Sequence, residues 1–287
     1  MPLPKISLVI PNLNCAEFIE DTIKSVLEQS YPNLELILSD GGSTDGSLEI
    51  ARRYSEKFAH IISGPDTGQA NAVNKGFAVA SGDVMGWINS DDILRPGGLA
   101  LVGSLFASRP DIDWVTGKIT SIDENGRLLR DHRPRPTTYE RLLAGDYQWV
   151  QQESTFWRKS LWDNAGKGLN EDLKLAVDGE LWLRFSRLSK LIPVHAQIGA
   201  FRFRKGQRSE AIDDYHTEML RVIENERGNI TSCSEVVAQI LDKPLKLRGQ
   251  KEAEMLFPKL REVDPKPMKW LQLIKIKAGL SRVRGTE

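Results

Sequence analysis

Residues 5–46 read KISLVIPNLNCAEFIEDTIKSVLEQSYPNLELILSDGGSTDG, and this stretch decides the fold. Residues 5–10 and 34–38 are short apolar runs of the kind that form buried strands. Residues 17–29 lie between them and repeat apolar side chains at helical spacing before a proline-containing turn. The stretch therefore predicts a strand–helix–strand unit, followed by a polar turn that can cap the next helix.

The same alternation continues through the first third of the chain. We expect a helix over 47–58, a strand over 60–63, a helix from 68 to 80 and a strand over 84–88. Strands that alternate with helices predict a parallel sheet with crossover helices, which is a Rossmann-like half. Asn89, Ser90, Asp91 and Asp92 follow the fourth strand, where open α/β sheets bind their ligands.

The pattern after residue 114 is less regular and predicts a second, mixed lobe. We expect a hairpin turn at 123–126, a Pro- and Arg-rich loop at 133–136, helices over 178–189 and 213–226 and a strand over 195–203. The α/β chain thus divides into a nucleotide-binding half at 1–115, a second half at 116–229 and a helical, basic extension at 230–287.

The composition is that of an ordinary globular protein. Among 287 residues, 39 Lys and Arg balance 39 Asp and Glu, so no net field attracts nucleic acid. Cys15 and Cys233 supply no disulfide framework and match no metal-ligand spacing, which favours a reducing compartment. The start lacks the apolar stretch of a signal peptide, and no run approaches the ~20 apolar residues of a membrane span. We therefore expect a cytoplasmic protein.

The end of the chain is basic and apolar at once. Residues 265–287 hold six Lys and Arg residues against the single acid Glu287, and Trp270, Leu273 and Ile276 are interspersed among them. This mixture is typical of a segment that lies in an anionic membrane interface, which predicts peripheral attachment to the inner face of the plasma membrane. A helix packed on the protein with solvated lysines is the alternative.

The acidic pair after the fourth strand is the central chemical feature. The chain contains no G-x-G-x-x-G and no G-x-x-x-x-G-K-[ST], so dehydrogenase and P-loop functions lose their main support. Asp91 and Asp92 could instead hold a divalent cation that neutralises a diphosphate leaving group. The alternative is a capping pair, because a helix is predicted over 93–107.

Four sequence blocks in a fixed order resemble family 2 glycosyltransferases. They are SLVIPNLN at 7–14, LSDGGSTDG at 38–46, GQANAVNKG at 68–76 and the segment from SGD at 81–83 through Asp92. The resemblance covers about residues 5–209. It implies a GT-A fold, a nucleotide-sugar donor and a Mn²⁺ or Mg²⁺ ion.

The resemblance also implies which residues contact the donor. A carboxylate at Asp40 would accept a hydrogen bond from the base, which favours the N3–H of uracil and hence UDP; a turn residue that satisfies its own backbone is the alternative. Lys75 could equally be solvated on its helix. Asn89 replaces the first Asp of the family's Asp-x-Asp motif, which moves the acidity to Asp91 and Asp92. The whole predicted donor set is Pro11, Asn14, Asp40, Gln69, Asn74, Lys75, Asn89, Ser90, Asp91, Arg202 and Arg204.

On the acceptor side, Asp178 matches the family's catalytic base. It directly begins a predicted helix, whereas the nearby pair Glu171 and Asp172 is interpreted as a loop ahead of it. The alternative is that Asp178 only caps this helix. Arg202 and Arg204 belong to a basic loop that could close over a diphosphate or be an ordinary exposed loop, and Arg204 stands where related sequences often carry a histidine.

These residues predict an inverting glycosyl transfer. Asp178 would deprotonate an acceptor hydroxyl as it attacks the anomeric carbon, while the metal and basic groups stabilise departing UDP. By analogy the acceptor is a saccharide or a lipid-linked molecule in surface polysaccharide or glycolipid synthesis. A sugar-nucleotide-forming nucleotidyltransferase is one alternative, although no glycine-rich loop follows the first strand. A non-catalytic nucleotide-sugar-binding protein is the other.

Overall fold

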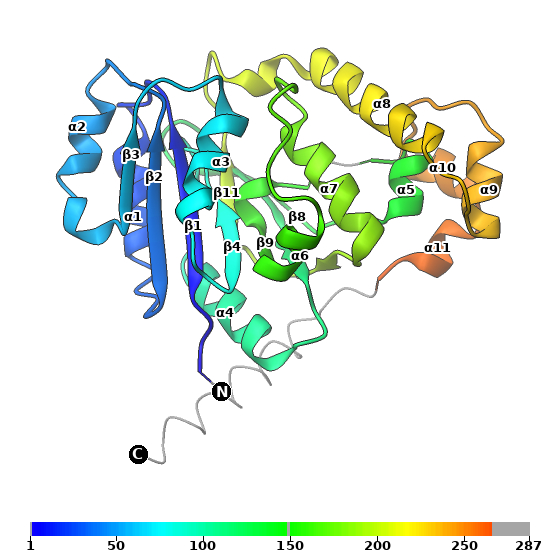
Figure 1. Ribbon diagram of the computed structural model, residues 1–287, viewed down its shortest axis with the longest axis horizontal. Coiled ribbons are helices and arrows are strands. Elements are labelled where there is room, and N and C mark those ends of the chain that lie inside the picture. The colour runs from blue at the N-terminus through cyan, green and yellow to red at the C-terminus, as the bar shows by residue number, and fades with distance from the viewer. Residues whose placement is uncertain (1, 148–149, 266–287) are drawn as a thin grey trace.

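The computed structural model describes residues 2–147 and 150–265. The first third forms the predicted alternation (Figure 1). Its strands are β1 (Ile6–Asn12), β2 (Leu34–Asp40), β3 (His60–Ser63) and β4 (Val84–Trp87). Its helices are α1 (Ile19–Leu27), α2 (Ser47–Arg52), the 3-10 turn η1 (Ser55–Lys57) and α3 (Gln69–Val79). The four strands run parallel to one another in the order β4-β1-β2-β3, as the alternation predicted.

The second half extends this sheet and adds a smaller one. Its strands are β5 (Ile93–Leu94), β6 (Trp114–Thr116), β7 (Ile119–Ile122), β8 (Leu128–His132), β9 (Thr155–Arg158), β10 (Ile192–Pro193) and β11 (Gly199–Arg202). The large sheet has the order β10-β6-β9-β4-β1-β2-β3, with β9 antiparallel to both neighbours. The small sheet has the order β5-β11-β7-β8, and its β7–β8 hairpin confirms the predicted turn at 123–126.

Helices cover both faces and one end of the sheet. Those of the second half are α4 (Gly98–Ser108), α5 (Tyr139–Leu143), η2 (Gln152–Ser154), α6 (Lys159–Asn164), α7 (Val177–Leu188), η3 (Arg208–Glu210) and α8 (Ile212–Gly228). The extension contributes α9 (Glu235–Leu241), α10 (Gln250–Leu256) and α11 (Leu260–Val263), which gather at the end of the molecule opposite α2 (Figure 1). No helix within the described ranges is long and apolar enough to cross a membrane.

Three predicted elements differ from the structure. The helix expected over 47–58 ends at Arg52, and the 3-10 turn η1 follows it. The helix expected over 93–107 begins only at Gly98, because Ile93 and Leu94 pair with β11 as a short strand. Pro96 lacks a backbone N–H, and Gly97 adopts a left-handed conformation with φ 78°, so the helix cannot start earlier. The strand expected over 195–203 is confined to β11, and a separate strand, β10, precedes it.

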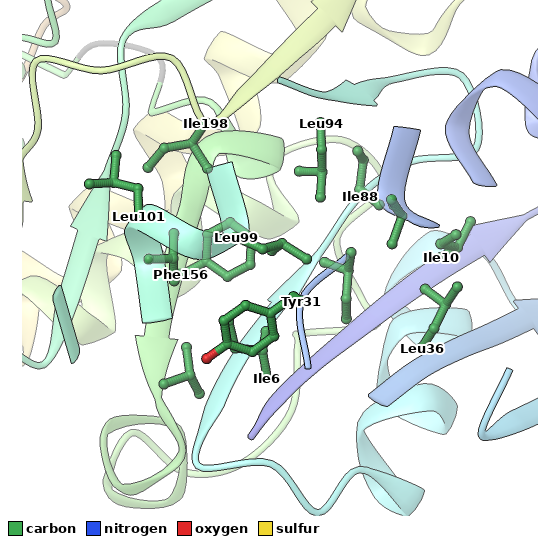
Figure 2. Packing of buried hydrophobic residues seen from close by; sticks show 14 of the residues in the cluster. Ile6, Ile10, Tyr31, Leu36, Ile88, Leu94, Leu99, Leu101, Phe156 and Ile198 are labelled. Carbon is green, nitrogen blue, oxygen red and sulfur yellow. The ribbon is translucent and has the colours of Figure 1, made fainter. Parts of the chain in front are cut away.

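Apolar side chains alternate between the two faces of the large sheet. Ile6, Leu8 and Ile10 of β1 pack into one core cluster, and Val9 packs into another cluster on the opposite face. Figure 2 shows the first cluster, where side chains from β1, β2, α4 and β9 converge. Each fully buried aliphatic or aromatic side chain contributes roughly 1.5–3 kcal/mol of hydrophobic stabilisation. The double-sided burial explains why these strands are continuous apolar runs.

The opposite face positions α7 against β4 through aromatic rings. Trp182 of α7 stacks on Trp87 of β4 with ring centroids 5.8 Å apart, and Trp157 of β9 meets both rings edge-on. Trp87 lies two residues before Asn89, and Trp182 lies about one helical turn after Asp178. The stacked pair therefore fixes the start of α7 relative to the segment that follows β4.

A third core cluster joins α5, α7 and α8 to the helices of the extension. Its members from the extension include Ile240, Ala253 and Leu260, each with no exposed surface. Arg141 of α5 is also fully buried and pairs with Asp146 at 2.5 Å, Glu254 at 2.8 Å and Asp264 at 2.6 Å. The sequence boundary expected at 229–230 thus separates segments that share one core. The basic tail at 268–284 lies outside the described residues.

Candidate active site

The C-terminal ends of β1, β2 and β4 bring the predicted polar residues to one edge of the large sheet. The register of β1 and β2 pairs Asn12 with Asp40. The chain leaving β4 follows β1, because the N–H of Ile88 donates to the carbonyl of Val9 at 2.9 Å. Asn89 and its neighbours therefore emerge beside the loop that follows β1.

Asp40 organises the turn that follows β2. Its carboxylate is buried and accepts hydrogen bonds from the amide of Asn12 at 2.8 Å, from the hydroxyls of Ser43 at 2.5 Å and Ser63 at 2.9 Å, and from the N–H groups of Gly42 and Ser43 at 3.1 Å. Burial alone would raise the pKa of Asp40, but the donors of Ser43 and Asn12 outweigh it and lower the pKa. These contacts match the turn role that the sequence left open.

Pro11 and Asn14 shape the first loop. Pro11 is a buried residue of β1, and Asn14 adopts a left-handed conformation with φ 50°. The side-chain oxygen of Asn14 accepts a hydrogen bond from the backbone N–H of Thr44 at 2.9 Å. The backbone N–H of Asn14 donates to the hydroxyl of Ser43, also at 2.9 Å. The two loops after β1 and β2 are thereby held together.

A directional chain of hydrogen bonds crosses the centre of the site. Arg208 donates from Nη1 to Oε1 of Gln69 at 2.7 Å, and Gln69 donates from Nε2 to Oδ1 of Asn89 at 2.5 Å. Asn89 then donates from Nδ2 to Oδ2 of Asp92 at 3.2 Å. We call this series the amide relay. It needs an amide at position 89, because that side chain both accepts and donates, and a carboxylate has no hydrogen to donate.

Asp91 and Asp92, expected to act as a pair, have different surroundings. Asp92 is buried, and its Oδ1 accepts the N–H of Arg202 at 2.8 Å while Oδ2 ends the amide relay. Burial and the adjacent charge of Asp91 raise the pKa of Asp92 well above its ordinary value. The carboxylate of Asp91 is partly exposed and pairs with Nε of Arg204 at 2.7 Å. Ser90 is buried, and its carbonyl accepts the thiol of Cys15 at 3.4 Å.

The donor atoms fit a divalent cation at Asp91 but not at Asp92. No group of three or more His, Cys, Asp or Glu side chains within residues 2–147 and 150–265 could hold a metal ion. Both oxygens of Asp92 are used within the fold, whereas the carboxylate of Asp91 is partly exposed and is paired with Arg204 through Oδ2. One carboxylate suffices where a substrate's phosphates supply further oxygens, which is common for Mg²⁺.

The basic loop after β11 contains arginines with different tasks. Arg202 is buried and donates to the carbonyls of Asp91 at 2.7 Å and Glu124 at 2.8 Å, so its guanidinium serves the fold. Arg204 is partly exposed and lies over the ring of Phe18 with its guanidinium carbon 5.6 Å from the centroid. The loop also borders a hollow of about 470 Å³, lined by Glu124, Phe203, Arg204, Lys205, Gln207, Ser209, Glu210 and Ile212.

Asn74 and Lys75, predicted near the diphosphate, hold neighbouring backbone instead. Asn74 accepts the N–H of Leu169 at 2.7 Å and donates to the carboxylate of Glu171 at 2.8 Å. Lys75 donates from Nζ to the carbonyl of Pro65 at 2.9 Å. Helix α3 thus binds the loop ahead of α7 through Asn74, and Gln69 alone of these three predicted residues joins the amide relay.

Asp178 is a buried carboxylate in the first turn of α7. It is the second residue of the helix, whose capping position is Ala176, so Asp178 is not the N-cap residue that the alternative required. Oδ1 of Asp178 accepts the N–H of Gly179 at 2.8 Å and the hydroxyl of Tyr215 at 3.2 Å. Burial raises the pKa of Asp178 to about 6 despite these two donors. Such a carboxylate is ionised at neutral pH, yet is a stronger base than an exposed one.

The other acids near α7 are engaged elsewhere. Glu180 accepts from Nε of Arg184 at 2.7 Å. Glu171 accepts from Asn71 at 2.9 Å and from Asn74, both on α3. Asp172 follows as part of the same exposed turn, as the loop interpretation predicted. Among these acids, Asp178 is therefore the buried one, and its two hydrogen bonds both use Oδ1.

Glu153 of η2 is a buried acid that the sequence analysis did not select. It is 1% exposed, and its Oε1 has no hydrogen-bond partner among the described residues. Burial, and then the charges of Asp178 and Asp91, raise its pKa. Glu153 is therefore close enough to both Asp178 and Asp91 for their charges to act on it, and its raised pKa favours the neutral form.

Four residues of the site were missed from the sequence: Asn12, Glu153, Arg208 and Tyr215. Asn12 lies in the block at 7–14, beside Pro11, and Arg208 follows Arg204 of the basic loop by four residues. Glu153 lies two residues before β9 among polar neighbours, and its burial gave no signal in the sequence. Tyr215 gave no signal, because its role depends on how α8 packs against α7.

Comparison with known proteins gives one family and a consistent set of relatives. The model of glycosyl transferase family 2 matches residues 7–161. A chondroitin synthase of Pasteurella multocida is 27% identical over 191 residues, which cover 66% of this chain and 19% of the synthase. The putative teichuronic acid biosynthesis glycosyltransferase TuaG of Bacillus subtilis is 37% identical over 92 residues, covering 31% of this chain and 36% of that protein. The chain thus spans about a fifth of the length of the synthase.

Solved structures share the fold. The S. aureus TarS 1–349 structure in complex with UDP-GlcNAc has a TM-score of 0.65 and 20% identity, with 83% of this chain and 70% of that chain covered. The mannosyltransferase PcManGT from Pyrobaculum calidifontis, in complex with GDP-Man and Mn²⁺, has a TM-score of 0.62 and 18% identity, with 100% of this chain and 77% of that chain covered. These matches confirm the predicted GT-A fold.

Proposed function

Because the chain belongs to glycosyl transferase family 2, we propose that it moves a sugar from a UDP-sugar to an acceptor hydroxyl with inversion at the anomeric carbon. The observation that carries the proposal is Asp178, a buried carboxylate whose pKa of about 6 suits a general base at neutral pH. One of its oxygens is held by Gly179 and Tyr215. The other oxygen takes the proton of the acceptor hydroxyl as that hydroxyl attacks the anomeric carbon, and a single displacement of this kind inverts the configuration.

The donor's diphosphate is assigned to the edge of the sheet at Asp91 and the basic loop. Arg204 and Arg208 offer guanidinium groups that can offset the charge of the leaving UDP. Asp91 would hold a Mn²⁺ or Mg²⁺ ion. Such an ion supplies further positive charge to the diphosphate. The ion pair between Arg204 and Asp91 would then break when the donor binds, because one guanidinium cannot pair fully with the carboxylate and with the phosphates at the same time.

Uracil recognition is assigned to the turn around Asp40. The carboxylate already accepts several hydrogen bonds, so the N3–H of the base must replace one of them. The hydroxyl of Ser43 is the donor that can turn away most easily, because it rotates about a single bond. The two similar structures are in complex with UDP-GlcNAc and with GDP-Man, so experiment must decide whether this protein prefers uracil or guanine.

The acceptor is assigned by class. The chondroitin synthase relative and the putative teichuronic acid biosynthesis enzyme support a role in polysaccharide synthesis, with a saccharide or lipid-linked acceptor. A cytoplasmic location, with the basic tail on the inner face of the plasma membrane, remains part of this proposal.

Incubation with individual nucleotide sugars, Mn²⁺ and candidate acceptors tests the proposal. We expect UDP release that depends on a UDP-sugar and on Asp178, and a product whose anomeric configuration is opposite to the donor's by NMR. Retention of configuration would contradict the mechanism. Formation of a sugar nucleotide from UTP and a sugar phosphate would favour a nucleotidyltransferase, and tight binding of UDP-sugar without turnover would favour a binding protein.

A further inference from the structure

Helices α7 and α8 approach each other unusually closely beside Asp178. Gly179 has no side chain, and a Cβ placed there would lie 2.3 Å from Sδ of Met219 and 2.8 Å from the hydroxyl oxygen of Tyr215. Both distances are far shorter than van der Waals contact. A residue larger than glycine at 179 would therefore displace the side chains of Met219 and Tyr215, so this glycine allows Tyr215 to reach the neighbouring carboxylate.

Tyr215 presents a fixed donor to Asp178. Its ring is 9% exposed, and its hydroxyl lies 3.2 Å from Oδ1 of Asp178. Burial and then the charge of Asp178 raise the pKa of Tyr215 well above its ordinary value, so the hydroxyl keeps its proton. The N–H of Gly179 donates to the same oxygen at 2.8 Å. Two donors on Oδ1 orient the carboxylate and leave Oδ2 as the oxygen that can accept a proton.

The same face of α8 also holds the segment that enters α7. Glu218 lies three residues after Tyr215 and accepts the N–H groups of Lys174 at 3.1 Å, Leu175 at 2.8 Å and Ala176 at 2.9 Å. These are the backbone donors just before and at the capping position of α7, which no side chain of their own segment satisfies. Helix α8 therefore fixes both the start of α7 and the carboxylate in its first turn.

We propose that Tyr215 is a positioning residue for the catalytic base, holding the carboxylate of Asp178 so that Oδ2 faces the acceptor hydroxyl. This inference rests on the proposed function of Asp178 as the base. It adds a role for α8, which lies beyond the part of the chain that the family model matches.

Other ionisable groups surround Asp178 and must be considered in any pH experiment. Arg208 of η3 favours the ionised carboxylate through its charge. Glu153 of η2 and Tyr147, which precedes it in the chain, both have raised pKa values to which the charge of Asp178 contributes, after burial. The hydrogen bond from Tyr215 lowers the pKa of Asp178. Its removal must therefore raise that pKa and move the acidic limb of the rate profile toward higher pH.

The test compares Tyr215→Phe with Tyr139→Phe. Tyr139 of α5 donates to Glu226 at the other end of α8 at 2.6 Å, so the control removes a hydroxyl of the same helix packing away from Asp178. We expect Tyr215→Phe to lower kcat by about ten- to a hundredfold, the usual worth of a hydrogen bond to a charged group, with the KM for UDP-sugar within about twofold. The acidic limb of its kcat profile should move to higher pH. Tyr139→Phe should keep both the rate and the profile.

Equal kcat values and equal acidic limbs for Tyr215→Phe and the unmodified protein would overturn the inference. A uniform loss of folded protein in both Phe variants would show a packing role for the hydroxyls and would also overturn it. Asp178→Asn, measured in parallel, separates this outcome from a failure of the proposed function. If Asp178→Asn keeps full activity, the base assignment itself is wrong. If Asp178→Asn is inactive and Tyr215→Phe is normal, only the role of Tyr215 is wrong.

Discussion

Replacing Asp178 with Asn should make the protein more stable and nearly inactive at the same time. Burial raises the pKa of Asp178 from 3.8 to about 6, so the folded protein resists the ionisation that the unfolded chain undergoes freely. One pKa unit corresponds to about 1.4 kcal/mol, which gives a cost of about 3 kcal/mol to the folded state once the carboxylate is charged. Asn has the same size, and its oxygen can still accept the N–H of Gly179 and the hydroxyl of Tyr215.

The stability difference between the two proteins must depend on pH. Below about pH 4 the carboxyl is protonated in both the folded and the unfolded chain, so it makes no difference. Between about pH 4 and pH 6 the unfolded chain loses this proton first, and the native free energy of unfolding falls as the pH rises. Above pH 6 the loss reaches its plateau. The advantage of Asp178→Asn should therefore be about 3 kcal/mol at pH 8 and about half of that at pH 5.

Urea denaturation of both proteins at pH 5 and pH 8 measures the difference, and other titrating groups largely cancel because they are common to both. Transfer rates at saturating donor should fall by about 10²–10⁴-fold in Asp178→Asn, the usual contribution of a positioned general base. The reasoning is refuted if the variant is less stable than the native protein at pH 8, or if its advantage is the same at both pH values. A near-native transfer rate would refute the catalytic assignment.

Three other changes test the remaining parts of the site and the tail. Asp91→Asn should abolish the gain in UDP affinity that Mn²⁺ gives in calorimetry, and equal Mn²⁺ dependence in the variant would contradict a metal role for Asp91. Asn89→Asp removes the donor to Asp92 and sets two carboxylates together, so the free energy of unfolding should fall by about 1–3 kcal/mol at pH 8; unchanged denaturation would contradict the amide relay. A chain ending at Pro265 should lose salt-sensitive co-sedimentation with anionic vesicles, and equal retention would contradict membrane attachment.

The first half of the fold could be predicted well because its signals are local. Strands buried on both faces, such as β1, β2 and β4, are continuous apolar runs, and the helices between them carry apolar stripes, so the existence and order of these elements follow from spacing. The helix expected over 93–107 was placed too early for one local and one non-local reason: Pro96 and Gly97 delay its start, and the two residues at its predicted beginning belong to a strand. Ile93 and Leu94 pair with Gly199 and Ala200, about a hundred residues away, and no local pattern records such a partner.

The acceptor-side residues show the same limit more sharply. Asp178 could be selected from the sequence because it stands in a recognisable block. Its pKa, however, comes from burial in the folded protein, and its fixed oxygen comes from Tyr215, 37 residues later in the chain. A tyrosine within an amphipathic helix has the same pattern whether it fills a core or orients a base. The packing of Gly179 against Met219 distinguishes the two roles, and that contact exists only in the folded protein.

Asn89 shows how a departure from a family motif can be explained by its neighbours. From the sequence, the missing first carboxylate of Asp-x-Asp left the choice of metal ligands open. In the structure, position 89 must accept a hydrogen bond from Gln69 and donate one to Asp92. An aspartate could accept but not donate, and it would face the buried carboxyl of Asp92 at close range. The amide of Asn89 therefore satisfies one oxygen of the buried carboxyl of Asp92. Asp91, which is partly exposed, is the carboxylate of this segment that can turn toward a cation.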